Sequence, residues 1–131
     1  MPGIVTAFDR IVVEVPAVET AAKELAVLLG ADSTAVGQGN RLVLLPNTSI
    51  ELQPGEGDKA RIRGLCLRAP AAADIGSLPA GHTLSDGAGT DLLRSQGAAV
   101  STLLVDHVVV QTRSAQDCIA LYRDRLGIRL A

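Results

Sequence analysis

Apolar and polar positions alternate along three separate stretches of the chain, which is the pattern of a β-strand with one buried face. The first stretch, residues 9–15, is rich in valine and isoleucine and ends at Pro16, which cannot donate a hydrogen bond to a neighbouring strand. Residues 61–69 and 103–112 form similar runs. After the first run, apolar residues recur three and four positions apart over residues 18–29, and this spacing predicts an amphipathic helix.

Three shorter strands are predicted directly after this helix, at residues 33–36, 40–45 and 48–53. Turn residues separate them: Gly37-Gln38-Gly39 lies between the first two strands and Pro46-Asn47 between the last two. The order in the first part of the chain is therefore strand, helix and three strands.

The first strand is repeated near the C-terminus. Residues 8–15 read FDRIVVEV and residues 105–112 read VDHVVVQT, at an offset of 97 positions (106 minus 9). The same offset places Leu126-Gly127 on Leu29-Gly30, so the match includes the following helix. A fainter copy, residues 64–70, lies between them at an offset of 54 (64 minus 10). Repeats of this kind indicate duplicated units that bury their apolar faces by packing on their copies.

The repeats predict an α+β fold built of βαβββ modules, with a curved and mostly antiparallel sheet that carries its helices on the outer face. Residues 1–60 would form the first module. Residues 61–103 would form a degraded second module and connector, with a short helix at 91–96, and residues 104–131 the opening strand and helix of a third, incomplete module. Because three strands of that module are missing, we expect either a homodimer that exchanges strands or a truncated piece of a longer protein.

Composition narrows the class of protein. The chain has 131 residues, of which 47% are hydrophobic, and this is enough for one globular core. A net charge of −2 and only two aromatic residues, Phe8 and Tyr122, argue against nucleic-acid binding. No stretch approaches the about 18 uncharged apolar residues of a membrane span, so we expect a cytoplasmic protein without membrane contact. Cys66 and Cys118 are interpreted as small apolar residues in a reducing compartment.

Each predicted strand divides into an apolar row and a polar row, because strand side chains alternate between the two faces of a sheet. If the apolar rows pack on the helices, six polar side chains share the opposite, concave face: Arg10, Glu14, Glu51, Gln53, His107 and Gln111. This face would either be simply solvated or form a cup for a small molecule or a metal ion.

These motifs resemble those of the vicinal oxygen chelate superfamily, which includes glyoxalases, bleomycin-resistance proteins and dihydroxybiphenyl dioxygenases. Residues 105–110, VDHVVV, are similar to an opening strand of that family in which the histidine is a metal ligand. Residues 48–54, TSIELQP, are similar to a closing strand in which the glutamate is another ligand. The resemblance implies paired βαβββ modules around a divalent metal ion (Zn, Mn, Fe, Ni or Mg) held by His107 and Glu51.

The resemblance also implies a function, namely a metal-dependent lyase, isomerase or dioxygenase that acts on a small oxygenated molecule. Glu51, or Glu14, would then be the catalytic base, and Arg10, Glu14, Gln53 and Gln111 would surround the ligand. A catalytic zinc ion usually has three protein ligands, whereas this chain offers two. A symmetric dimer would supply four.

Arg10 supports a different function, because it stands where the first copy would carry the metal-ligating histidine. Its positive charge would repel a divalent ion and favour an ion pair with Glu51. This predicts a protein that uses no cofactor and binds and sequesters a small molecule, as resistance proteins do. A truncated module without independent activity is the third hypothesis.

Three further features of the sequence remain open. His107 could equally be a neutral imidazole that is hydrogen-bonded on a half-buried strand. Lys59, Arg61 and Arg63 would either meet an anionic substrate or form a solvated face. The sequence does not indicate a functional role for His82.

Overall fold

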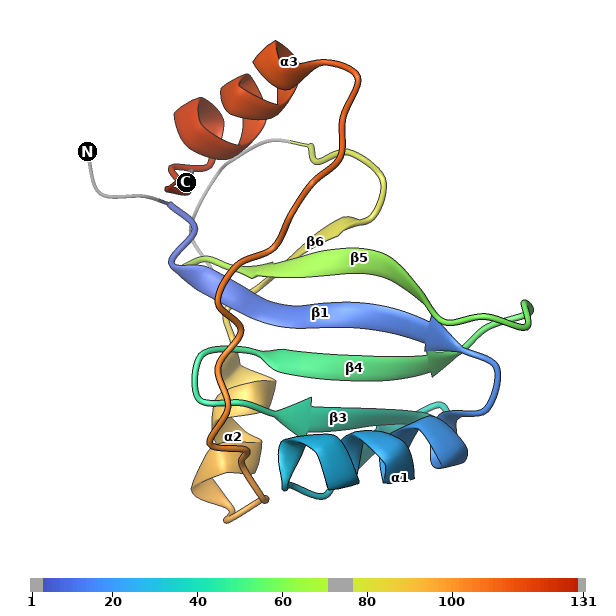
Figure 1. Ribbon diagram of the computed structural model, residues 1–131. Helices are drawn as coiled ribbons and strands as arrows, with labels where there is room; N and C mark the ends of the chain where they lie inside the picture. Colours follow the sequence, from blue (N-terminus) through green and yellow to red (C-terminus); the bar gives the residue numbers. More distant parts are fainter. Residues whose placement is uncertain (1–3, 71–76, 130–131) are drawn as a thin grey trace.

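A six-stranded mixed sheet runs through the centre of the protein (Figure 1), in a computed structural model that describes residues 4–70 and 77–129. The strands lie in the order β2-β3-β4-β1-β5-β6, which makes β1 a central strand. Among the described residues, three strand pairings are antiparallel, while β1 with β4 and β5 with β6 are parallel. The elements are β1 (Ala7–Val15), α1 (Val18–Leu29), β2 (Thr34–Gly37), β3 (Asn40–Leu44), β4 (Ser49–Pro54), β5 (Arg61–Arg68), β6 (His82–Ser85), α2 (Ala88–Ser95), α3 (Ala115–Ile119) and the π-helix η1 (Ala120–Arg125).

The strand, helix and three strands predicted for the first part of the chain are confirmed, with bounds that agree to within about two residues. The helix ends as its glycine predicts, because Gly30 adopts a left-handed conformation with φ 67°. Gly127, its counterpart in the repeat, has φ 71° at the end of the C-terminal helix. The two copies therefore share a backbone conformation at the end of the helix as well as a sequence pattern. The α+β class is also confirmed.

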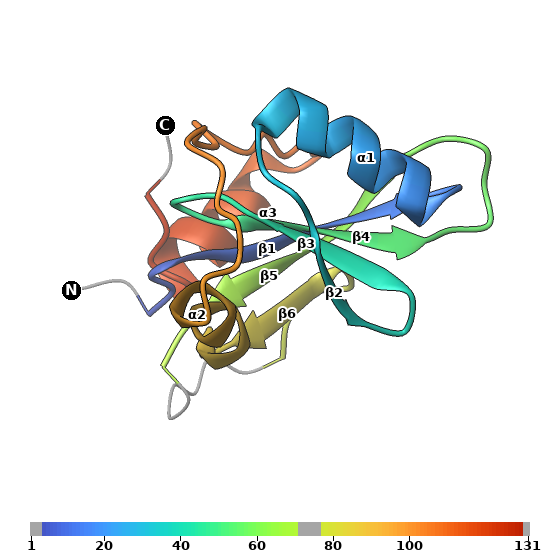
Figure 2. The ribbon, with the colours of Figure 1, turned by 90° about the horizontal axis from the view of Figure 1, so that it is seen from below.

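Two apolar clusters pack on one face of the sheet. Under α1, Val15 and Leu52 of the sheet contact Val18 and Ala22 of the helix. Under the C-terminal helix, Tyr122 and Leu126 lie in a second cluster with sheet residues Ile11, Leu65 and Leu67. Figure 2 shows α1 and α3 on this side of the sheet, and α2 on the other side, near the end of β6. We call that other side, opposite α1 and α3, the open face.

The helix expected at 91–96 is present but begins earlier, at Ala88, and it does not pack beside the other helices. The strand β6 was not predicted, because it has only four residues in a stretch rich in glycine and proline. Residues 71–76, which the prediction includes in a second module, lie outside the described residues. None of the described helices has both the length and the apolar character needed to cross a membrane.

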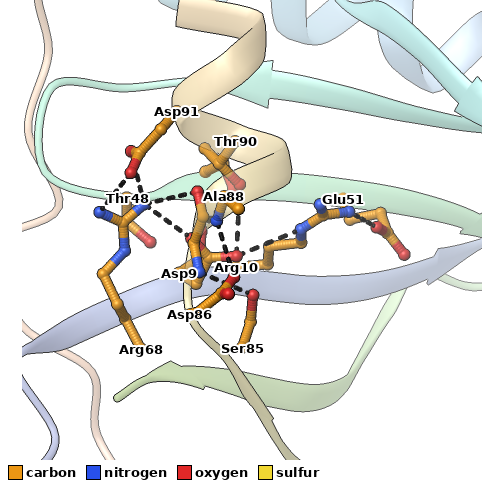
Figure 3. Close-up of polar contacts among 12 residues, drawn as sticks. Asp9, Arg10, Thr48, Glu51, Arg68, Ser85, Asp86, Ala88, Thr90 and Asp91 are labelled. Atoms are coloured by element: carbon orange, nitrogen blue, oxygen red, sulfur yellow. Dashed lines mark hydrogen bonds and ion pairs between the residues drawn. The ribbon is translucent and has the colours of Figure 1, made fainter. Parts of the chain in front are cut away.

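A β-bulge inserts an extra residue, Asp9, into β1. Phe8 pairs with Leu67 and Arg10 with Cys66, so two steps along β1 match one step along β5. The insertion interrupts the alternation of side chains and turns the Asp9 carboxylate away from the apolar cluster, towards α2 (Figure 3).

The carboxylate of Asp9 joins three elements of the fold. It accepts hydrogen bonds from Arg68 of β5 at 3.1 Å, from Thr90 of α2 at 3.2 Å and from the adjacent Arg10 at 3.4 Å. Its side chain is 1% exposed. The Asp9 carbonyl oxygen also accepts a 2.6 Å bond from Ser49 of β4. A buried charge with so many partners ties α2 to the centre of the sheet.

The strand predicted at residues 103–112 is wrong for the single chain. These residues cross the helix-bearing side of the sheet in an extended path (Figure 1) and pair with no strand among residues 4–70 and 77–129. Val105 and Val108 still pack against the apolar cluster, whereas Val109 is 74% exposed. The physical reason is that β4 and β5 already occupy both sides of β1, so its copy finds no free strand beside it.

Replacing Asp9 should test how far the fold depends on this buried charge. We expect Asp9→Asn to lower the free energy of unfolding by about 3 kcal/mol, because it leaves buried donors without their charged acceptor. Asp91→Asn removes a carboxylate that also binds Arg68 but is 57% exposed, and it should cost less than about 1 kcal/mol. Urea denaturation of both variants gives the comparison, and equal losses would contradict the role assigned to Asp9.

Hydrogen exchange tests the extended segment. In the single chain, amide protons of residues 106–112 should exchange at nearly the rate of an unstructured peptide, while those at the centre of β1 should be strongly protected. The predicted homodimer by strand exchange requires the opposite result, namely protection in this segment that increases with protein concentration. Mass spectrometry at two concentrations distinguishes these outcomes.

Candidate functional site

The open face of the sheet contains a cleft of about 530 Å³. Its walls come from β1, β4, β5, β6 and the turn before β6, and its polar lining includes Arg10, Glu51, Gln53, Arg63, Thr83 and Ser85. This volume lies within the range of about 300–1,000 Å³ that is usual for small-molecule sites.

The centre of the cleft is an ion pair between Arg10 and Glu51, as the sequence predicted. Arg10 Nη1 donates to Glu51 Oε1 at 2.5 Å, and Gln53 Nε2 donates to Glu51 Oε2 at 2.5 Å, so both carboxylate oxygens are bound. Burial lowers the pKa of Arg10, but the hydrogen bond and charge of Glu51, together with the charge of Asp9, outweigh it and raise the pKa above its ordinary value. Arg10 is therefore a permanent cation in the cleft.

A second charged group lies beside the cleft. Glu14 is buried and accepts hydrogen bonds from Arg63 at 3.1 Å and from Arg61 at 3.3 Å. Arg63 reaches this position because a second irregularity, between the Val12 and Val13 pairings, inserts it into β5 as an extra residue. The side chains of both arginines are mostly exposed, so water screens these pairs. Two guanidinium groups therefore share the carboxylate of Glu14.

Bare backbone forms part of the cleft wall. The Leu65 N–H donates to the Gly81 carbonyl oxygen at 2.8 Å, and this brings the turn before β6 against Gly64. A Cβ atom at Gly64 would collide with the Gly81 carbonyl group. Steric packing therefore explains why the middle copy of the repeat has Gly64 at the position where the other copies carry Arg10 and His107.

Cys66 also lines the cleft, but it is not poised as a nucleophile. Its side chain is buried, and burial raises the pKa of the thiol, although a hydrogen bond with Thr83 opposes this. At neutral pH the thiol keeps its proton, which agrees with the prediction of a small apolar residue.

The two predicted metal ligands do not meet within one chain. Glu51 lies on the open face, whereas Val105 and Val108 hold the segment that carries His107 on the opposite side of the sheet. His107 is 65% exposed, and its Nδ1 lies 2.7 Å from a carboxylate oxygen of Asp106. Gln111, predicted to lie beside the ligand, is exposed in the same segment.

The donor set does not fit the divalent ion that the resemblance implies. No group of three histidine, cysteine, aspartate or glutamate side chains that could hold a metal ion occurs in the part of the chain that is described. Both oxygens of Glu51 are engaged by Arg10 and Gln53, and the arginine places a positive charge where the ion would bind. The four-ligand site of a symmetric dimer stays a prediction.

The sequence alone did not reveal Thr83 and Ser85 as cleft residues. A signal for β6 exists, because the short run His-Thr-Leu-Ser lies between Gly81 and the turn residues Asp86-Gly87. Four residues are too few to separate such a strand from a loop by pattern alone.

Comparison with known proteins does not add a family assignment. No protein-family model matches the sequence, and no curated protein matches it. The likeness to the vicinal oxygen chelate superfamily thus rests on two short sequence motifs and on the strand and helix order of the first module.

The close approach at Gly64 can be tested by adding a single methyl group. We expect Gly64→Ala to lower the free energy of unfolding by about 1–3 kcal/mol, because β5 and the Gly81 turn must separate. Gly89→Ala is a matched control in α2, where the new Cβ lies 3.6 Å from Arg10 Nη2 and finds room. It should stabilise by up to about 1 kcal/mol. If Gly64→Ala is as stable in urea as the wild-type protein, then the cleft wall can rearrange at little cost, and this outcome would contradict the prediction.

Proposed function

We propose that this protein binds a small oxygenated molecule with a carboxylate group in the open-face cleft, and that it does so without a metal ion. The observation that carries this proposal is the Arg10 guanidinium, which lines a cleft of about 530 Å³ and lies 2.5 Å from Glu51. A cation therefore occupies the place that the resemblance implies for a metal ligand.

The charges around the cleft favour an anion. The charged residues that line the cleft are two arginines, Arg10 and Arg63, and one carboxylate, Glu51. This excess of positive charge in the lining would attract a carboxylate from solution, and a guanidinium group is a charged hydrogen-bond donor for it.

The remaining lining supplies partners for neutral oxygen atoms. Gln53, Thr83 and Ser85 carry amide and hydroxyl groups at the cleft wall. Hydroxyl and carbonyl groups of a ligand can exchange hydrogen bonds with them, so a hydroxylated or keto carboxylate suits the cleft better than a hydrocarbon. Sequestration of such a molecule needs no catalytic base, which agrees with a Glu51 carboxylate already engaged on both oxygens.

Two substitutions in the ion pair should act in opposite directions. Arg10→Gln should weaken the binding of lactate, pyruvate or malonate about tenfold or more, because it removes a charged donor. Glu51→Gln should strengthen the same binding about threefold, because the internal carboxylate no longer competes for Arg10. Lys59→Gln is the matched control, since it removes one positive charge outside the cleft lining. Melting temperatures at increasing ligand concentration measure all four proteins.

Two results would contradict the proposed function. One is the absence of any shift in melting temperature with the three carboxylates, which the hypothesis of a module without independent activity predicts. The other is stoichiometric binding of Zn²⁺ or Mn²⁺ in equilibrium dialysis that is lost in Glu51→Gln and in His107→Ala. That outcome would favour the metal-dependent enzyme.

A further inference from the structure

A second recess, of about 480 Å³, lies between β6 and the C-terminal helix. It shares no lining residue with the open-face cleft, because successive side chains of β6 point to opposite faces of the sheet. Thr83 lines the cleft, and the preceding His82 lines the recess. Most of its wall is apolar and comes from Pro79, Cys118, Ala120 and Leu121, while two charged residues, Asp117 and Arg125, also line it.

Two side chains that are distant in sequence meet in this recess. His82 Nε2 lies 2.6 Å from the hydroxyl oxygen of Tyr122, and the two ring centres are 5.6 Å apart. The other ring nitrogen, Nδ1, lies 3.3 Å from the carbonyl oxygen of Ala80. A carbonyl group can only accept, so in the neutral ring Nδ1 carries the proton and Nε2 accepts the hydroxyl proton of Tyr122.

This arrangement makes the Tyr122 oxygen an acceptor. Its single proton is directed to His82, while its lone pairs stay available to a hydrogen-bond donor in the recess. The residue is 9% exposed, and burial raises the pKa of its hydroxyl group above the ordinary value. The group therefore remains a neutral phenol at physiological pH. A polar acceptor at an apolar wall is the usual arrangement of a site that orients a small ligand.

The backbone around Tyr122 departs from the repeat. Residues 115–125 correspond to residues 18–28 of the first module, which form a regular α-helix. In the C-terminal copy, Ala120–Arg125 form a π-helix, with the Leu126 N–H bonded to the Leu121 carbonyl oxygen at 2.9 Å. Turns of this kind are rare and occur frequently at functional sites. Here the wide turn carries Tyr122 and lies beside the recess.

We propose that the recess binds a small, flat and mainly apolar molecule that carries one N–H or O–H donor. The donor binds the Tyr122 oxygen, and the flat body of the molecule packs on Ala120 and Leu121. Indole has this chemistry, and 1-methylindole is the same molecule without the donor. The protein contains no tryptophan, so indole fluorescence reports the bound probe without interference from that residue.

The experiment compares the two probes on the full chain by fluorescence titration. Wild-type protein should bind indole about tenfold more tightly than 1-methylindole, the loss expected for one buried hydrogen bond. Tyr122→Phe should reduce the affinity for indole to that for 1-methylindole and leave 1-methylindole unchanged. Leu92→Ala, an exposed change on α2 that does not touch the recess, should leave both affinities as in the wild type.

A second variant and a second readout cover the case in which Tyr122→Phe does not fold. Ala120→Leu does not alter Tyr122 or His82 but places a larger side chain at the wall of the recess, and it should weaken the binding of both probes about tenfold or more. Indole should also slow alkylation of Cys118, which lines the recess, in the wild-type protein. Arg10→Gln should leave indole binding unchanged, which separates this site from the carboxylate cleft.

Equal affinities for the two probes in the wild type would overturn the proposal, and so would an Ala120→Leu variant that binds as the wild type does. In either case the contact between His82 and Tyr122 would serve only to hold β6 against the C-terminal helix.

Discussion

The buried carboxylate of Asp9 is the interaction on which the rest of this structure depends. It lies in the central strand at a bulge and receives hydrogen bonds from β5, from α2 and from its neighbour Arg10. A charge that is 1% exposed is stable only while these partners remain in place. The consequence reaches the cleft, because Arg10 donates to Asp9 with Nε and to Glu51 with Nη1. The position of the cleft cation is thus set by a charge at the centre of the fold.

Alternation along β1 and β4 was enough to predict that their polar residues share a face, whereas His107 and Gln111 do not lie on it. Arg10, Glu14, Glu51 and Gln53 lie on the open face as expected, and the ion pair of Arg10 with Glu51 follows from two opposite charges on neighbouring strands. The bulge could not be predicted, because an inserted residue leaves no mark in a period-two pattern until the partner strand is known. For this reason the sequence revealed Arg10 but not the role of Asp9.

The extended C-terminal segment shows that a sequence pattern typical of a β-strand does not by itself produce a strand. Residues 105–112 have nearly the same pattern as β1, yet β1 exists because β4 and β5 lie on its two sides. The copy packs Val105 and Val108, both partly buried, against the apolar cluster and leaves its backbone without a strand partner among the described residues. Strand propensity measures the fit of a side chain to a pleated surface and cannot supply that surface. Within the single chain, His107 consequently lies on the side of the sheet opposite Glu51.

One position of the repeat has three different physical environments, and each explains its own residue. Arg10 is held between Asp9 and Glu51, where a permanent cation is needed to balance two carboxylates. Gly64 lies where the Gly81 carbonyl group leaves no space for a Cβ atom. His107 is exposed beside Asp106, with no packing constraint on its ring. The first two residues are required by their surroundings even if no ligand binds. The ligand that we propose for the cleft would meet the charge of Arg10 as the fold already presents it, and this charge suits an anion better than a metal ion.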